Sequence, residues 1–135
     1  MTEMVSLSGE DLQAAVRSRI LVIDDNEVLA RSFARMLRMY ETLVENDPRN
    51  AVARIQSGER FDIILCDLRM PTMTGVEVLA WIRAHFEDRP GMPSVVLMSG
   101  SDELTEADVG IPVLMKPCAA ADVRALVGRL VESSR

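Results

Sequence analysis

Acidic, hydroxyl and basic side chains follow short apolar runs at four places in the sequence. Asp24-Asp25, Asp67 and Ser99 supply carboxylates and a hydroxyl, and Lys116 supplies an ammonium group. Carboxylates gathered in a partly desolvated pocket repel one another and raise one another's pKa values, which a divalent cation relieves. Oxygen ligands of this kind suit Mg²⁺, which combines one or two carboxylates with water and phosphate oxygens. A nearby lysine and hydroxyl would neutralise and hydrogen-bond phosphoryl oxygens, so the set points to phosphoryl chemistry beside Mg²⁺.

Each of these residues also has an ordinary structural role when it is taken alone. An aspartate pair often caps a helix and begins a turn, Asp67 is able to cap a loop, and Ser99-Gly100 is common turn chemistry. Lys116, taken alone, is explained equally well as an ordinary lysine exposed to solvent. The signal lies in the combination, because chance does not readily place all of these parts, in order, at the ends of successive strands.

Five short β-like runs carry these residues at or just beyond their ends. The first, third and fourth runs are almost continuously apolar, as are strands buried on both faces of a parallel sheet. The second run is more polar and suits the edge of a sheet. The predicted strands are Ile20–Asp24, Glu41–Glu45, Phe61–Asp67, Ser94–Ser99 and Ile111–Met115.

Helical patterns lie between the predicted strands. Asn26 is placed to cap the first helix, Asp47-Pro48 to begin the second, and Thr74 with Glu77 to form a capping box for the third. The last helix lacks a good N-cap, because Ala119 stands where one is wanted. The predicted helices cover Glu27–Met39, Asp47 to Gly58, the residues after Thr74, a couple of turns within Ser101–Asp108, and about Ala120–Val131.

The alternation of strands and helices predicts an α/β fold of the (βα)₅ type. Such chains form a doubly wound parallel sheet, with right-handed crossovers and helices on both faces. Ligands of these folds bind beyond the carboxyl ends of the strands. The three carboxylates, the hydroxyl and the lysine are therefore expected at one edge of the sheet.

Composition limits the other functions that are open to the chain. Its 135 residues suit one domain, and its net charge of −6 argues against direct nucleic-acid binding, which needs basic residues to neutralise phosphates. The two cysteines have no metal-ligand spacing. With no apolar stretch long enough to span a membrane and no signal peptide, the cytoplasm is the expected compartment and no membrane insertion is predicted. Residues 1–18 are predicted to be an N-terminal extension or linker, with Ser8 and Asp11 able to open a short helix.

Four motifs of the sequence resemble those of the receiver domain of bacterial response regulators, the CheY-like family. The matching pieces are ILVIDDN (20–26), FDIILCDLRMPTMTG (61–75), VVLMSG (95–100) and VLMKP (113–117). The resemblance covers nearly the whole chain and predicts a receiver domain over residues 19–133. It implies a flavodoxin-like sheet of five parallel strands in the order 2-1-3-4-5.

The resemblance also implies a metal site and a phosphoacceptor. Asp67 would accept the phosphoryl group, and Mg²⁺ would be bound directly by Asp25, mainly through water by Asp24, and by the backbone carbonyl of Arg69. Asp67 itself would complete the ligand set.

The remaining motif residues are expected to contact the phosphoryl group. Ser99 would hydrogen-bond it, and Lys116 would pair with one of its oxygens, oriented by a cis Lys116-Pro117 bond. The phosphodonor would be a sensor histidine kinase or a phosphotransfer protein. Signalling would pass to a downstream protein target or a parent hybrid kinase by protein contact, and the domain itself is not expected to be an enzyme.

Three departures from the family pattern concern the output side of the domain. Val113 stands where strand five usually carries an aromatic residue that changes rotamer on activation. Lys116 lies only 17 positions after Ser99, so the fourth helix is expected to be short or displaced. Cys118 replaces the common aromatic residue after Lys-Pro.

Two alternative functions remain open from the sequence. A pseudo-receiver would bind partners without turning over phosphate, and Val113 with the short fourth helix is its only support. An aspartyl-phosphate phosphatase of the haloacid-dehalogenase type is disfavoured, because Arg69 stands where its second aspartate is needed and 135 residues leave no room for a cap domain.

Overall fold

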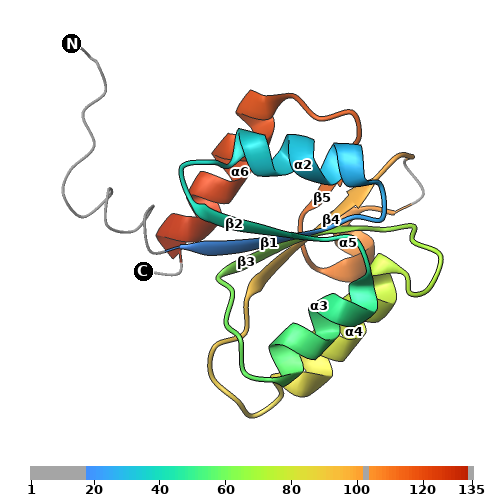
Figure 1. Cartoon of the computed structure of the whole chain (residues 1–135), viewed down its shortest axis with the longest axis vertical. Helices are drawn as coiled ribbons and strands as arrows, with labels where there is room; N and C mark the ends of the chain where they lie inside the picture. The colour runs from blue at the N-terminus through green and yellow to red at the C-terminus, as the bar shows by residue number, and fades with distance from the viewer. Residues whose placement is uncertain (1–17, 102–103, 134–135) are drawn as a thin grey trace.

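The computed structural model describes residues 18–101 and 104–133, which form a three-layer α/β domain (Figure 1). A central parallel sheet is covered by helices on both faces. The predicted helix opened by Ser8 and Asp11 lies outside the described residues. Within the described part of the chain, no helix is long and apolar enough to cross a membrane.

The sheet has five strands in the order β2-β1-β3-β4-β5, all parallel, as predicted. The relatively polar strand β2 lies at one edge, and the short β5 lies at the other. The strands are β1 (Arg19–Ile23), β2 (Glu41–Glu45), β3 (Ile63–Asp67), β4 (Ser94–Ser99) and β5 (Val113–Met115).

Five helices follow the strands in turn. Helices α2 and α6 cover one face of the sheet, and α3, α4 and the short α5 lie on the other (Figure 1). Their bounds are α2 (Glu27–Met36), α3 (Pro48–Gln56), α4 (Gly75–His85), α5 (Glu106–Val109) and α6 (Ala120–Ser133).

The predicted N-caps of the first three helices are present. The side-chain oxygen of Asn26 accepts a hydrogen bond from the Leu29 amide at 3.1 Å and begins α2. At the start of α3, the Asp47 carboxylate accepts from the Arg49 amide at 2.9 Å. Thr74 and Glu77 form a reciprocal capping box at the start of α4. Asn26 and Asp47 lie within three residues of the ends of β1 and β2, so these two caps also fix where the chain leaves the sheet.

The sheet separates two hydrophobic cores. Alternate residues of β1, β3 and β4 point to opposite faces, so Ile20, Val22 and Leu65 pack under α2 and α6, while Leu21 and Ile64 pack under α3 and α4. These central strands are almost completely buried. The rigid sheet therefore holds the strand ends, and the residues that follow them, in fixed positions.

Some predicted boundaries differ from the structure. Helix α2 ends at Met36 and not at Met39; Leu37 still packs in the core although it lies beyond the last helical residue. Strand β5 begins at Val113 and not at Ile111, and Pro112 has no amide hydrogen to extend the ladder. The fourth helix is short, as expected, with only four residues in α5.

Candidate functional site

The carboxyl edge of the sheet brings the predicted site residues together. Asp24 follows β1, Asp67 is the last residue of β3, Ser99 is the last residue of β4, and Lys116 follows β5. One carboxylate oxygen from each of Asp24, Asp25 and Asp67 lies within 4.8 Å of the others. The parallel topology therefore assembles an acidic cluster from residues that are 43 positions apart in the sequence.

Lys116 bridges two members of this cluster. Its Nζ donates a hydrogen bond to Asp67 Oδ1 at 2.9 Å and lies 3.6 Å from Asp24 Oδ2. Burial opposes the charge of Lys116, but the hydrogen bond to Asp67 and the charges of Asp24 and Asp67 outweigh it and raise the pKa of the ammonium. The lysine is therefore held in its charged form beside the predicted phosphoacceptor.

Asp24 is the most constrained of the three carboxylates. It is completely buried, and Oδ1 accepts a hydrogen bond from the Asn26 amide at 2.9 Å. Its Oδ2 is buried with no hydrogen-bond partner among the described residues. Burial and the neighbouring charges of Asp67 and Asp25 raise the pKa of Asp24, against the opposing effects of the Asn26 amide and Lys116. A buried carboxylate oxygen that accepts no hydrogen bond, in a cluster of three carboxylates, fits a divalent cation with oxygen ligands.

The other two acidic residues differ in exposure. Asp25 is exposed, while Asp67 is only 7% exposed. An ion or a phosphoryl group would therefore enter from the Asp25 side, and Asp67 would meet it at the base of the site. Arg69, whose carbonyl is the expected further ligand, is exposed in the loop between β3 and α4.

The hydroxyl of Ser99 is hydrogen-bonded to the backbone of Ser101 in this structure. Ser99 Oγ donates to the carbonyl of Ser101 at 2.7 Å and accepts from the Ser101 amide at 3.2 Å. The carbonyl of Ser99 accepts from the Lys116 amide at 2.7 Å, which ties the ends of β4 and β5 together. Ser99 must leave the Ser101 carbonyl before its hydroxyl donates to a phosphoryl oxygen.

The backbone behind Asp67 is closely packed. A Cβ atom placed on Gly75 would lie 2.6 Å from the Asp67 carbonyl oxygen and 3.0 Å from Leu68 Cα. The Gly75 amide also donates to the Leu68 carbonyl at 2.8 Å. Glycine at this position lets the first turn of α4 lie directly against the strand end that carries Asp67.

Cys66 is a packing residue of the hydrophobic core. It is completely buried between β-strand neighbours, its Sγ donates to the Asp67 carbonyl at 3.4 Å, and burial raises the pKa of its thiol. Cys118 is half-buried, and its Sγ donates to the Met115 carbonyl at 3.0 Å. The Lys116-Pro117 peptide bond is cis, as expected.

Two supporting residues were not singled out from the sequence. Asn46 follows β2 and donates from Nδ2 to the carbonyl of Asp24 at 2.9 Å. Gly75 was quoted only as part of a motif, without its contact to Asp67. Both contact the backbone of an aspartate of the cluster, so only the three-dimensional arrangement assigns them to the site.

A family model described as response regulator receiver domain matches residues 20–127. The chain belongs to this family. The match covers the sheet except for Arg19 and includes the acidic cluster, and it agrees with the CheY-like, flavodoxin-like fold expected from the motifs.

Solved receiver domains have the same fold as this one. The signal receiver domain of a putative LuxO repressor protein from Vibrio parahaemolyticus matches 88% of this chain and 93% of its own length, with a TM-score of 0.76 and 26% identity. The chemotaxis response regulator CheY4 of Vibrio cholerae matches 85% of this chain and 99% of its own length, with a TM-score of 0.70 and 25% identity.

Curated relatives match the receiver domain over part of their length. The two-component response regulator ORR42 of Oryza sativa subsp. japonica is 41% identical over 68 residues, 49% of this chain and 52% of that protein. An uncharacterized 76.5 kDa protein of Thiocystis violacea is 37% identical over 89 residues, 64% of this chain and 13% of that protein. The chain thus spans about half the length of the first relative and about an eighth of the second.

Proposed function

We propose that this receiver domain accepts a phosphoryl group on Asp67 from a phosphohistidine of a sensor histidine kinase or a phosphotransfer protein. The observation that carries the proposal is the contact of Lys116 Nζ with Asp67 Oδ1 at 2.9 Å, inside a cluster of three carboxylates. A nucleophilic carboxylate beside a fixed ammonium and an ion site has the parts that phosphoryl transfer requires.

The transfer step forms one bond and breaks one. An Asp67 carboxylate oxygen attacks the phosphorus, the P–N bond to the donor histidine breaks, and its electron pair returns to the imidazole. Lys116 moves from Asp67 to a phosphoryl oxygen and keeps a positive charge beside the transferred group. A Mg²⁺ ion held by Asp24, Asp25, Asp67 and the Arg69 carbonyl would neutralise charge on the phosphoryl oxygens.

The signal would begin at Ser99. A phosphoryl group on Asp67 offers an acceptor that competes with the Ser101 carbonyl for the Ser99 hydroxyl. Exchange of this hydrogen bond would shift the population of the segment between β4 and α5. Output by contact with another protein follows from this, because the change reaches the surface beside α5 and β5.

The partner classes are supported by the kinds of proteins that contain similar segments. A probable histidine kinase 4 of Oryza sativa subsp. japonica is 40% identical over 67 residues, 7% of that protein. The DNA-binding response regulator MtrA of Mycolicibacterium smegmatis is 35% identical over 89 residues, 37% of that protein. A receiver related to both classes is compatible with a separate protein target or a parent hybrid kinase.

A pseudo-receiver is the second candidate, and one observation favours it. Val113 is half-buried at the start of β5 and packs with the core under α3 and α4, where an aromatic residue would be expected to change rotamer. A domain without that rotamer change would signal through its unphosphorylated surface instead.

The test is the intact mass of the protein after incubation with acetyl phosphate, with and without Mg²⁺. We expect one phosphoryl adduct that needs Mg²⁺ and is absent in Asp67→Asn. Asp88→Asn is the matched control, because Asp88 is an exposed aspartate with φ 64°, a conformation that asparagine tolerates. Undiminished labelling of Asp67→Asn would refute the assignment of the phosphoacceptor. No adduct in the folded wild-type protein would favour the pseudo-receiver.

A further inference from the structure

The backbone of Asp24 is bonded to the corner between β2 and α3. Asn46 donates from Nδ2 to the Asp24 carbonyl at 2.9 Å, and the Asp24 amide donates to the Glu45 carbonyl at 3.2 Å. Because β1 and β2 are paired parallel strands, this corner lies beside the end of β1. Asp24 is therefore supported by two residues that do not belong to the acidic cluster.

Three of the four polar atoms of Asp24 form hydrogen bonds with neighbouring residues. Besides the amide and the carbonyl, Oδ1 accepts from the Asn26 amide at 2.9 Å, while Oδ2 has no partner among the described residues. Of these three bonds, only the one from Asn46 is made by a side chain. A substitution at position 46 therefore releases one of these bonds without changing the backbone or the cluster itself.

Repulsion within the acidic cluster acts against this position of Asp24. One of its carboxylate oxygens lies within 4.8 Å of those of Asp25 and Asp67. A single ammonium, that of Lys116, faces the cluster; it bonds to Asp67 and lies 3.6 Å from Asp24 Oδ2. Without a cation, the repulsion favours movement of Asp24 away from the other carboxylates, and the bond from Asn46 resists that movement.

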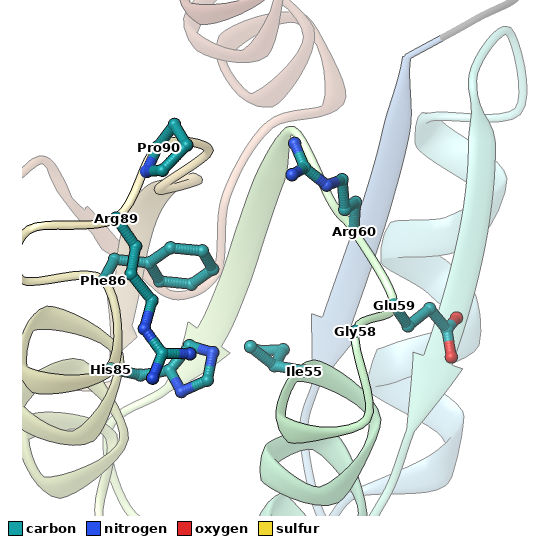
Figure 2. A pocket seen from close by; sticks show the side chains of 8 residues that line it. All are labelled: Ile55, Gly58, Glu59, Arg60, His85, Phe86, Arg89 and Pro90. Carbon is teal, nitrogen blue, oxygen red and sulfur yellow. The ribbon is translucent and has the colours of Figure 1, made fainter.

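Ion pairs hold the corner from the side of α3. Arg54 donates from Nε to Glu45 Oε2 at 2.6 Å and from Nη1 to Glu59 Oε2 at 3.0 Å. Glu59 borders a cavity that His85 also lines, but Figure 2 shows its side chain pointing away from His85. The side chain of Glu45 is only 15% exposed. Asn46 therefore follows a residue that is itself fixed in the fold.

We propose that Asn46 is a positioning residue for the ion site. Its amide holds the backbone of Asp24, so the Asp24 carboxylate is in place before a divalent cation binds. Asn46 is exposed and uncharged and bonds to the carbonyl, so it acts through Asp24 and not on the cation. A site whose ligands are already in place loses less free energy in ordering them when the ion binds. This inference rests on the ion site of the proposed function.

Mg²⁺ alone is the probe, and the amide chemical shift of Asn26 in the whole chain is the measurement. This amide bonds to Asp24 Oδ1, so its shift reports the Asp24 carboxylate directly. Asn46→Leu removes the donor with little change in side-chain size, and we expect Mg²⁺ to bind about threefold to tenfold more weakly. Asn46→Gln keeps an amide donor at an exposed position, so it should retain most of the wild-type affinity.

Asn50→Leu is the matched control, because Asn50 is another exposed asparagine, in the first turn of α3. It should bind Mg²⁺ as the wild type does. The affinity is that of the folded protein, so a variant that only unfolds more easily keeps the wild-type affinity, and urea unfolding in EDTA measures its loss of stability separately. In EDTA, exchange of the Asn26 amide should be several-fold faster in Asn46→Leu, because Asp24 is held less firmly.

Equal Mg²⁺ affinity of the wild type and Asn46→Leu would refute the positioning role, while the ion site itself would stand. An equal loss of affinity in Asn46→Leu and Asn46→Gln would refute the role of the amide donor. A wild-type protein whose amides do not respond to Mg²⁺ would overturn the ion site of the proposed function, and this inference with it. Because no phosphodonor is present, the assignment of Asp67 as phosphoacceptor is tested separately by labelling.

Discussion

The buried carboxylate of Asp24 is expected to lower the stability of the metal-free protein and, for the same reason, to suit a cation site. Its carboxylate is completely buried beside two others, and one of its oxygens lacks a hydrogen bond among the described residues. A buried charged group without its full set of partners costs free energy of folding. The same unsatisfied oxygen is what makes the position suitable for a cation.

Asp24→Asn is expected to stabilise the metal-free protein at neutral pH. The change removes a buried negative charge, and we expect the free energy of unfolding to rise by about 1–3 kcal/mol. The pKa of Asp24 is raised in the folded state, so its charge is unfavourable above that pKa and absent at low pH. The gain should therefore shrink as the pH falls towards the ordinary range of aspartate, as measured by urea unfolding in EDTA.

Mg²⁺ provides the control for this prediction. The ion should stabilise the wild type, because it binds only the folded cluster, and should stabilise Asp24→Asn less. Equal stability of the two proteins in EDTA at neutral pH would contradict the role given to the buried carboxylate.

The sequence predicted the residues of the site better than their contacts. The positions of Asp24, Asp67, Ser99 and Lys116 follow from strand ends, which apolar runs mark well. The sequence does not predict the orientation of the Ser99 hydroxyl towards Ser101, because this orientation depends on a hydrogen bond to a backbone atom. The close approach of Gly75 to Asp67 depends likewise on the angle between α4 and the sheet.

At the scale of elements, the start of α4 packs directly behind Asp67, the proposed phosphoacceptor. The first turn of this helix packs on the backbone of Asp67 and Leu68, and the capping box of Thr74 and Glu77 fixes its direction. Sequence signals predicted the capped starts of the helices better than the ends. Leu37, for example, is buried just beyond the end of α2, so its apolar character extended the predicted helix too far.

Gly75→Ala and Gly128→Ala are expected to have opposite effects. The Cβ of alanine at position 75 would collide with backbone atoms, so we expect a loss of about 1–3 kcal/mol in stability and slower labelling by acetyl phosphate. At position 128, inside α6, nothing lies within 4 Å, and alanine should add about 0.5–1 kcal/mol through helix propensity. Thermal unfolding and phosphorylation rates check both, and a harmless Gly75→Ala would argue against the close packing.

Helix α5 depends on a contact from α4. Arg83 donates from Nη2 to the Val109 carbonyl at 2.7 Å, which satisfies the end of a helix of only four residues. The shortness of α5 was predictable because Lys116 lies only 17 positions after Ser99, but the contact with Arg83 was not predictable.

Arg83→Gln should loosen α5 while leaving the sheet intact. Loss of the hydrogen bond to Val109 is expected to speed amide exchange of the Gly110 amide, which donates to Glu106, by several-fold. Hydrogen exchange of the whole chain measures this, with Arg129→Gln on α6 as the control. Unchanged exchange at Gly110 would mean that α5 is held by its own capping residues Thr105 and Asp108.

At the scale of the whole molecule, the same sheet contributes side chains to both hydrophobic cores. Successive residues of β1, β3 and β4 point into opposite cores, so both cores depend on the same three strands. Because the same strands contribute to both cores, the domain is expected to unfold as a unit.

Leu37→Ala and Leu79→Ala, one in each core, test whether the two cores unfold together. Leu37 lies in the core under α2 and α6, Leu79 lies in the core under α3 and α4, and each change should cost about 2–5 kcal/mol. Trp81, the single tryptophan, packs against the second core, so its fluorescence reports that face, whereas far-UV circular dichroism reports all the helices. In both variants we expect the two signals to give the same urea midpoint.

Val28→Ala is the control, because this residue is 75% exposed and its change should shift the midpoint little. If Leu37→Ala separated the two transitions, the face under α2 and α6 would unfold on its own, and the sheet would not couple the two cores.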